Sequence, residues 1–200
     1  MKWQGKTWAT LGDSITEANG YQPLVRAALG FAEVANEGRS GCPMTAGGDT
    51  DEGSTVRVGA GLGRFDCVTV FAGVNDFRLS KSLGAPSDTD IYTFYGAYAT
   101  LIEGILKAHP ACRLNLWTPL HRDKDGYDAD TRNGDGRRLD DYAEAVRCLG
   151  MRYALPVLDL YRESGIHALT LPLFTSDGLH PSEAGHARIA GMAASFLERL

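Results

Sequence analysis

The stretch CVTVFA, residues 67–72, decides the fold, and the polar turn GVND, residues 73–76, follows it at once. A continuous run of β-branched and apolar residues of this length is typical of a strand buried on both faces. Such strands belong to parallel sheets whose two faces are covered by helices. The stretch therefore predicts a strand inside an α/β protein.

Strand-like and helix-like patterns alternate along the rest of the chain. Further strands are expected at residues 7–11, 31–35, 113–118 and 156–160. Helices are expected at residues 21–29 and 90–108, from about Leu139 onward, and after Pro181. This alternation predicts a flavodoxin-like three-layer sandwich with a five-stranded parallel sheet in the order 2-1-3-4-5. We expect one domain over residues 1–200, because no linker or internal repeat divides the chain.

The composition excludes several classes of partner. The net charge of −5, without a local Lys/Arg cluster, argues against binding to nucleic acid or to an anionic membrane. No apolar run approaches the ~20 residues that a membrane span needs. The start of the chain, MKWQGKTWATLGD, has no run long enough for a signal peptide, so we expect a cytoplasmic protein. No feature of the sequence indicates an oligomeric state.

No metal or cofactor is expected. The four cysteines are dispersed without a CxxC pair, which disfavours a zinc site and favours free thiols; two of them, Cys67 and Cys112, are expected in buried strands. The glycine-rich residues 59–63 precede a strand and lack the GxGxxG spacing of a nucleotide site. The acidic residues 123–135 lack the glycine position and closing glutamate of a calcium loop. We interpret residues 121–136 as a solvated loop at the rim of a site.

Ser14 lies in GDSIT, residues 12–16, directly after the first predicted strand. Two interpretations are open. Ser14 and Glu17 have the spacing of a capping box, in which the serine begins a helix and does no chemistry. A serine in a Gly-Asp turn after an apolar strand also lies where a nucleophile could sit.

Among the five histidines, His180 has a suitably spaced carboxylate. It lies in DGLHP, residues 177–181, where Pro181 suits the first turn of the last helix and favours an extended His180. The carboxylate of Asp177 can hold the imidazole Nδ1 and leave Nε2 free to take a proton from a serine. The alternative is that Asp177 forms an Asx-turn and His180 caps the helix.

Two further residues could stabilise a developing negative charge. Asn75 follows the strand at residues 67–72, and its side-chain amide can donate a hydrogen bond. Gly41 closes NEGRSG, residues 36–41, and its backbone N–H is open to a substrate because no side chain blocks it. The carboxyl ends of parallel strands meet at one edge of a sheet, so we expect these residues to lie near Ser14.

Taken together, these four motifs resemble those of the SGNH hydrolases, also called GDSL-type esterases. The motifs GDSIT, NEGRSG, GVND and DGLHP occur in the family's order, and the resemblance covers residues 8–186. It implies the SGNH-hydrolase fold, with Ser14, Asp177 and His180 as the catalytic triad and the oxyanion hole at Ser14, Gly41 and Asn75. Ile15 replaces the leucine of the GDSL name, and residues 51–64 are shorter than in many relatives.

The resemblance implies a serine esterase that hydrolyses carboxylic esters through an acyl-enzyme and needs no metal or cofactor. A small-molecule ester is the expected partner, and we favour short acyl or O-acetyl esters, as in carbohydrate deacetylases. The alternatives are a lysophospholipase or thioesterase, and an acyltransferase that uses the same triad. A non-catalytic binding module is disfavoured, because such a protein needs no intact triad.

Overall fold

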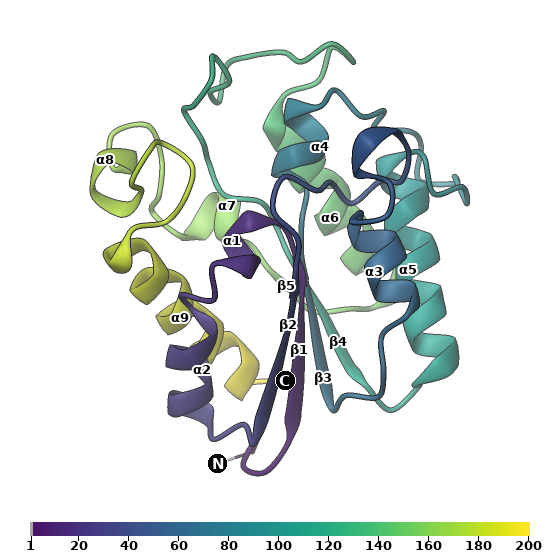
Figure 1. Ribbon diagram of the computed structural model, residues 1–200, viewed down its shortest axis with the longest axis vertical. Coiled ribbons are helices and arrows are strands. Elements are labelled where there is room, and N and C mark those ends of the chain that lie inside the picture. Colours follow the sequence, from purple (N-terminus) through teal and green to yellow (C-terminus); the bar gives the residue numbers. More distant parts are fainter. Residues whose placement is uncertain (1) are drawn as a thin grey trace.

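A five-stranded parallel sheet forms the centre of the protein (Figure 1). The computed structural model describes residues 2–200. The strands are β1 (Thr7–Gly12), β2 (Glu33–Gly38), β3 (Cys67–Phe71), β4 (Arg113–Trp117) and β5 (Val157–Leu158). Their order is β2-β1-β3-β4-β5, and every neighbouring pair is parallel. The α/β class and the strand order predicted from the sequence are confirmed.

Helices cover both faces of the sheet (Figure 1). One layer holds α1 (Ser14–Glu17), α2 (Gln22–Leu29), α7 (Leu160–Glu163), α8 (Leu171–Phe174) and α9 (Glu183–Glu198). The other layer holds α3 (Thr55–Ala60), α4 (Val74–Arg78), α5 (Phe94–Ala108) and α6 (Leu139–Tyr153). A short 3-10 turn, Gly48–Thr50, lies in the segment between β2 and α3.

Strand β3 joins the two hydrophobic cores. All five of its residues are buried. Because side chains alternate along a strand, Val68 and Val70 pack into the core beneath α3–α6, whereas Cys67 and Phe71 pack into the core beneath α2 and α9. The apolar run therefore behaves as the sequence predicts, with no face left for solvent.

Two strands differ from their predicted bounds by more than one residue at an end. β2 begins at Glu33 and continues to Gly38, because Asn36 and Gly38 pair in register with Thr10 and Gly12 of β1. This edge strand is only partly buried, so polar residues extend it at little cost. β5 is only Val157–Leu158, because the side chain of Asp159 then caps α7.

Several helix boundaries also differ from expectation. α5 begins at Phe94, after its cap Thr93, rather than at residue 90. α9 begins at Glu183 with Ser182 as its cap, so neither Pro181 nor His180 belongs to the helix. The one-turn helices α4, α7 and α8 were not expected; each is too short for a periodic pattern. Gly30 ends α2 as predicted, with a left-handed φ of 80°.

The capping-box interpretation of Ser14 is wrong. Asp13 is the cap of α1, and its Oδ1 accepts a hydrogen bond from the Ile15 N–H at 3.0 Å. Ser14 is thus the first helical residue, and its side chain is free for another partner. In GDSIT, Asp13 therefore caps the helix, and the adjacent Ser14 has its hydroxyl available for chemistry.

The four cysteines are free thiols, as expected. Cys67 is buried in β3, but Cys112 precedes β4 and is only partly buried, so its assignment to a strand is wrong. None of the helices formed by residues 2–200 is both long and apolar enough to cross a bilayer.

Candidate active site

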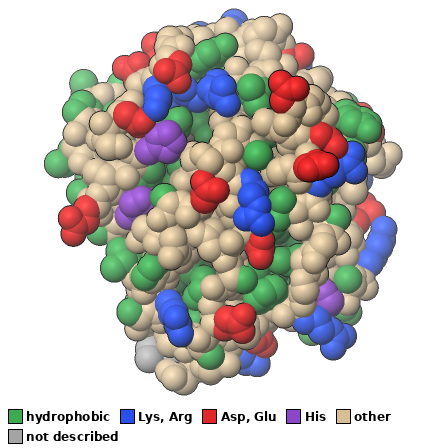
Figure 2. All heavy atoms as spheres, viewed as in Figure 1, with side chains coloured by type: hydrophobic (Ala, Val, Ile, Leu, Met, Phe, Trp, Pro, Cys, Tyr) green, Lys and Arg blue, Asp and Glu red, His purple; other side chains and the backbone are tan. Residues whose placement is uncertain are grey.

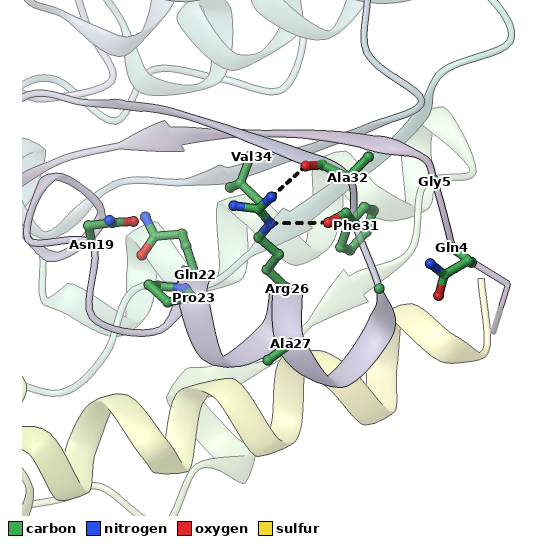
Figure 3. Close-up of a pocket in the computed structure, with 11 residues that line it drawn as sticks. Gln4, Gly5, Asn19, Gln22, Pro23, Arg26, Ala27, Phe31, Ala32 and Val34 are labelled. Atoms are coloured by element: carbon green, nitrogen blue, oxygen red, sulfur yellow. Dashed lines mark hydrogen bonds between the residues drawn. The ribbon is translucent and has the colours of Figure 1, made fainter.

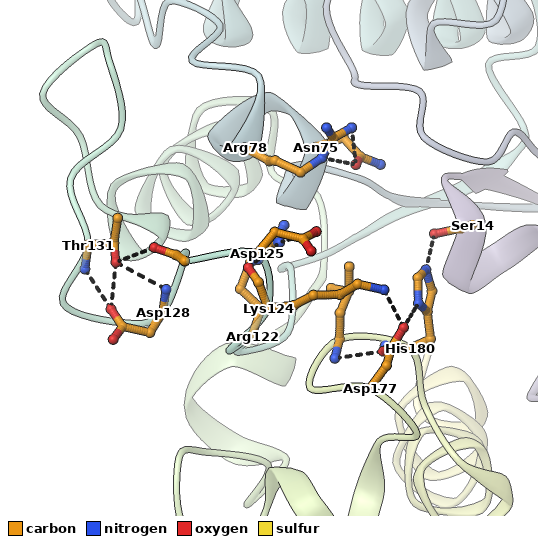
Figure 4. A network of polar contacts seen from close by, with 12 residues as sticks. Ser14, Asn75, Arg78, Arg122, Lys124, Asp125, Asp128, Thr131, Asp177 and His180 are labelled. Carbon is orange, nitrogen blue, oxygen red and sulfur yellow. Dashed lines mark hydrogen bonds and ion pairs between the residues drawn. The ribbon is translucent and has the colours of Figure 1, made fainter.

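The structure brings Ser14, His180 and Asp177 into one hydrogen-bonded chain (Figure 4). The Oγ of Ser14 lies 3.0 Å from Nε2 of His180, and Nδ1 of His180 lies 2.8 Å from Oδ2 of Asp177. Ser14 follows β1, whereas the other two residues lie in the turn before α9. The carboxyl edge of the sheet therefore unites residues 166 positions apart in the sequence.

The contacts of His180 define its tautomer. A carboxylate can only accept hydrogen bonds, so the contact with Asp177 places the imidazole proton on Nδ1. Nε2 then carries a lone pair and accepts the hydroxyl proton of Ser14. This is the arrangement that a general base needs.

Asp177 performs both of the roles that the sequence left open. Its Oδ1 accepts from the backbone N–H groups of Leu179 at 3.1 Å and His180 at 2.8 Å, which makes the expected Asx-turn. Its Oδ2 holds the imidazole. The turn thus fixes the carboxylate relative to the ring that it orients.

Two backbone N–H groups of the predicted oxyanion hole are unpaired. Within residues 2–200, neither the N–H of Ser14 nor that of Gly41 donates to another protein atom. Gly41 has a φ of 72° and open space where a Cβ would stand, so its backbone is exposed to an approaching substrate. Unpaired backbone donors are what an oxyanion hole requires.

Asn75, at the start of α4, is 4% exposed and held in one orientation. The Nε and Nη2 atoms of Arg78 each lie 3.4 Å from Oδ1 of Asn75; a guanidinium only donates, so this contact identifies the oxygen. Nδ2 donates one proton to the Cys42 carbonyl at 3.2 Å. Its second proton is left for a ligand.

Asp76 ties the loop after β2 to α4. The backbone N–H groups of Met44 and Thr45 donate to its carboxylate at 2.7 and 3.0 Å. Burial raises the pKa of Asp76, and the two hydrogen bonds oppose that rise. The contact positions the loop that carries Gly41 against the helix that carries Asn75.

A second buried acid, Asp13, directly precedes Ser14. Burial raises its pKa to about 7; the hydrogen bond from Ile15 opposes this rise, the charge of Asp76 adds to it, and His180 again opposes it. Ser14 thus follows a residue whose ionisation falls near neutral pH.

The comparisons with known proteins identify the family. The family model of the GDSL-like lipase/acylhydrolase family matches residues 10–188. The chain belongs to this family. It is an ester-hydrolysing serine hydrolase of the GDSL type. No curated protein matches the sequence.

Solved structures resemble this GDSL-type hydrolase over its whole length. One is 32% identical, with a TM-score of 0.91, and covers 100% of this chain and 99% of its own. A protein from Lactobacillus plantarum is 31% identical, with a TM-score of 0.88 and 98% coverage of both chains. A possible lipase from Chitinophaga pinensis is 23% identical, with a TM-score of 0.77, covers 97% of this chain and 98% of its own, and shows a shared fold.

The loop at residues 121–136 of the hydrolase packs against the triad. The N–H of Asp123 donates to the Gly178 carbonyl at 2.8 Å, and Lys124 donates from Nζ to Oδ2 of Asp177 (Figure 4). Burial raises the pKa of Asp177, but hydrogen bonds from Lys124 and His180 outweigh it and hold that pKa well below its usual range. The loop is thus part of the site's electrostatics, which no sequence motif indicated.

The sequence did not single out Lys124, Arg78 or Asp76 for a role in the site. Asp76 stands in GVND beside Asn75, so its place after a buried strand was a usable signal. Lys124 lies in an irregular loop, where no periodicity relates it to Asp177. Among residues 2–200, no three His, Cys, Asp or Glu side chains converge as a possible metal site.

A hollow of about 640 Å³ between α2 and β2 does not belong to this site (Figure 3). None of the five residues predicted for the site lines it. The guanidinium of Arg26 crosses it and donates to the carbonyls of Phe31 and Ala32 at 3.1 and 2.6 Å. Its charged group is therefore already engaged in holding the chain between α2 and β2.

Proposed function

We propose that Ser14, His180 and Asp177 form the catalytic triad of this hydrolase, and that it cleaves carboxylic esters through an acyl-enzyme. The unbroken chain of contacts from Ser14 Oγ through His180 to Asp177 carries the proposal. A serine with only a structural role would not need a neighbouring imidazole that is held in place by a carboxylate. Such an arrangement activates a hydroxyl for attack.

In the first half-reaction, Ser14 Oγ attacks the ester carbonyl while Nε2 of His180 takes the hydroxyl proton. The tetrahedral intermediate then collapses: the bond between carbonyl carbon and alkoxy oxygen breaks, and His180 gives its proton to the leaving alcohol. Asp177 keeps the imidazole in its orientation and stabilises its cation. The acyl group remains bound to Ser14 as an ester.

In the second half-reaction, water attacks the acyl-Ser14 carbonyl and His180 takes one proton from it. Collapse breaks the bond between the acyl carbon and Ser14 Oγ, and the proton returns to the serine. The carboxylic acid then leaves. Atoms balance: one ester and one water give one acid and one alcohol.

The developing oxyanion is stabilised by the N–H groups of Ser14 and Gly41 and by the side-chain amide of Asn75. The two backbone donors are unpaired, and Asn75 keeps one free proton. Donors fixed before reaction act without reorganisation, so one donor contributes about 10²–10³ in rate.

A short acyl or O-acetyl ester is the substrate class that the surroundings of Ser14 favour. The side chains of Asn75, Arg78 and Lys124 beside the triad are polar or charged. A long alkyl chain would desolvate such groups without pairing them. A small polar ester, such as an acetylated carbohydrate, would not leave these groups desolvated and unpaired.

A chain-length series tests this assignment. We expect kcat/KM for p-nitrophenyl esters to fall from acetate to octanoate, and acetylated sugars to release acetate. Preference for long chains would indicate a lysophospholipase or thioesterase, and product formed only with an added alcohol would indicate an acyltransferase.

Replacement of Ser14 tests the mechanism itself. Ser14→Ala is expected to abolish turnover and labelling by a fluorophosphonate, with unchanged thermal unfolding. Ser195→Ala, on the distant α9, is the matched control and retains both. Esterase activity that persisted in Ser14→Ala would exclude Ser14 as the nucleophile.

A further inference from the structure

Arg122 is buried with few hydrogen-bond partners for a guanidinium; its Cζ lies 5.6 Å from the centroid of the Tyr127 ring, a cation–π contact that satisfies no N–H. It is 1% exposed, and its Nε and Nη1 atoms have no hydrogen-bond partner within residues 2–200. Nη2 donates to the Lys124 carbonyl at 2.9 Å. The closest carboxylate contact is with Asp125, 3.9 Å from Nη2, and that side chain is 62% exposed. A buried cation is thus left with unused donors.

A second guanidinium lies nearby. Arg78 forms no ion pair within residues 2–200, and its donors reach only Oδ1 of Asn75, at 3.4 Å. Burial lowers the pKa of Arg122, and the charge of Arg78 lowers it further. Figure 4 places both arginines on the Asn75 side of the Ser14–His180 pair. Arg78 therefore adjoins the proposed oxyanion hole through Asn75, and Arg122 lies close enough to interact with the charges of Arg78 and Asp177.

The contrast with Arg147 shows that this arrangement is unusual for the chain. Arg147 has a side chain 14% exposed and contacts three carboxylates, those of Asp140, Glu144 and Asp159, at 2.8 to 3.2 Å. The charge of Arg147 is therefore neutralised within the fold, whereas the charge of Arg122 is not. The donors of Arg122 and the charge of Arg78 are kept for something else.

An anion placed near both guanidinium groups would remove the imbalance. Carboxylate and phosphate oxygens match the donor geometry of arginine, and an anion between two cations replaces their repulsion with attraction. The chain as a whole carries a net charge of −5, which repels anions unless the site has a field of opposite sign. Figure 2 shows Lys and Arg side chains grouped beside a histidine in the upper part of one face, with Asp and Glu side chains bordering the group.

We infer that Arg78 and Arg122 form an anion subsite, and that the natural substrate is an ester with a carboxylate or phosphate group close to the scissile bond. The inference rests on the proposed esterase function and narrows its substrate class. The loosely held carboxylate of Asp125 marks the place of the anion. A substrate group that displaces Asp125 reaches Nη2 of Arg122 and places its charge beside the buried guanidinium.

Two matched substrate pairs test the subsite. 4-Acetoxybenzoate and neutral 4-acetoxybenzamide differ by one charge on the alcohol part; monomethyl glutarate and methyl glutaramate differ in the same way on the acyl part. For the wild type we expect kcat/KM to favour the anionic member of at least one pair by about tenfold or more, the value of one charge-assisted hydrogen bond. The preferred pair identifies the side of the ester that carries the charge.

Variants assign the preference to the two arginines. Arg78→Met and Arg122→Met are expected to reduce the anionic-to-neutral ratio to near one, whereas Arg78→Lys retains part of it. The ratio is measured within each variant, so a general loss of activity cancels. Arg137→Met, at the exposed position directly after the loop at residues 121–136, also removes one positive charge and keeps the wild-type ratio. Should Arg122→Met not fold, Arg78→Met carries the test.

The outcomes separate this inference from the esterase proposal. A wild type that hydrolyses both members of each pair equally well has no anion subsite, although it remains an esterase. A preference that survives both arginine variants would also overturn the assignment. A wild type that hydrolyses none of the four esters would overturn the subsite and count against the esterase proposal.

Discussion

Replacing Gly178 with alanine should displace Asp177 and His180 of the proposed triad and reduce activity, although the three triad residues themselves are unchanged. Gly178 lies between Asp177 and His180 with a φ of 81°, and a Cβ there would stand 1.9 Å from the Asp123 carbonyl oxygen. The same backbone accepts the hydrogen bond from the Asp123 N–H at 2.8 Å. The turn at residues 177–180 and the loop at residues 121–136 are therefore in direct backbone contact.

The size of the effect follows from these distances. Ordinary contact begins at 3.4 Å, so the two segments must separate by about 1.5 Å. That displacement breaks a hydrogen bond worth about 1 kcal/mol, and alanine at positive φ adds about 1–2 kcal/mol. We expect the free energy of unfolding to fall by about 2–3 kcal/mol. A shift of about 1 Å in a catalytic group lowers rates by about 10²-fold, so kcat should fall by about that factor.

Gly136→Ala is the matched control. Gly136 lies in the same loop with a φ of 73°, but nothing stands within 4 Å of its Cβ position. Gly136→Ala should lower the free energy of unfolding only by the cost of alanine at positive φ, about 1–2 kcal/mol, and should leave kcat unchanged. Urea unfolding and p-nitrophenyl acetate kinetics measure both quantities. If Gly178→Ala kept kcat within twofold of Gly136→Ala, the contact with Asp123 would not be what positions the triad.

Three further predictions address electrostatics. Lys124→Met removes a charge-assisted hydrogen bond to the Asp177 carboxylate, so kcat on p-nitrophenyl acetate should fall by about tenfold or more, while Lys124→Arg retains most of it; an unchanged kcat would exclude this role. Asn75→Ala should lower kcat on p-nitrophenyl acetate by about 10²–10³, and a loss confined to KM would exclude oxyanion binding. Burial raises the pKa of Asp13 to about 7, so the folded state holds a proton that the unfolded state releases, and stability falls as pH rises from about 4 to 7. Asp13→Asn should remove that fall, gaining up to about 4 kcal/mol over wild type between pH 4 and pH 8 in urea unfolding; equal pH slopes would contradict it.

The sequence predicts those parts of the fold that local patterns specify. The runs at β1, β3 and β4 are apolar because both faces are covered, and the amphipathic helices α2, α5 and α6 follow their period. The extent of β2 is decided by pairing with β1, so its polar half could not be recognised. The one-turn helices are defined by caps and by the segments around them, which leave no periodic signal.

The candidate site likewise contains residues that local patterns predict and contacts that they do not. Ser14, Asn75, Asp177 and His180 were predictable because each stands at the end of a predicted element with a residue type suited to its chemistry. The contact between Lys124 and Asp177 joins two irregular segments 53 residues apart. Its formation depends on backbone conformations that no pattern encodes, such as the left-handed Gly178.

The buried charged side chains of residues 2–200 gather at one edge of the sheet. Asp13 and Asp76 are buried acids with raised pKa values, and Arg122 is a buried cation with unused donors. A protein selected for stability alone would neutralise such groups, as it does at Arg147. Fixed charges and donors that wait for a substrate are instead what electrostatic catalysis requires. Substitutions that stabilise this edge are therefore expected to reduce turnover, whereas those elsewhere are not.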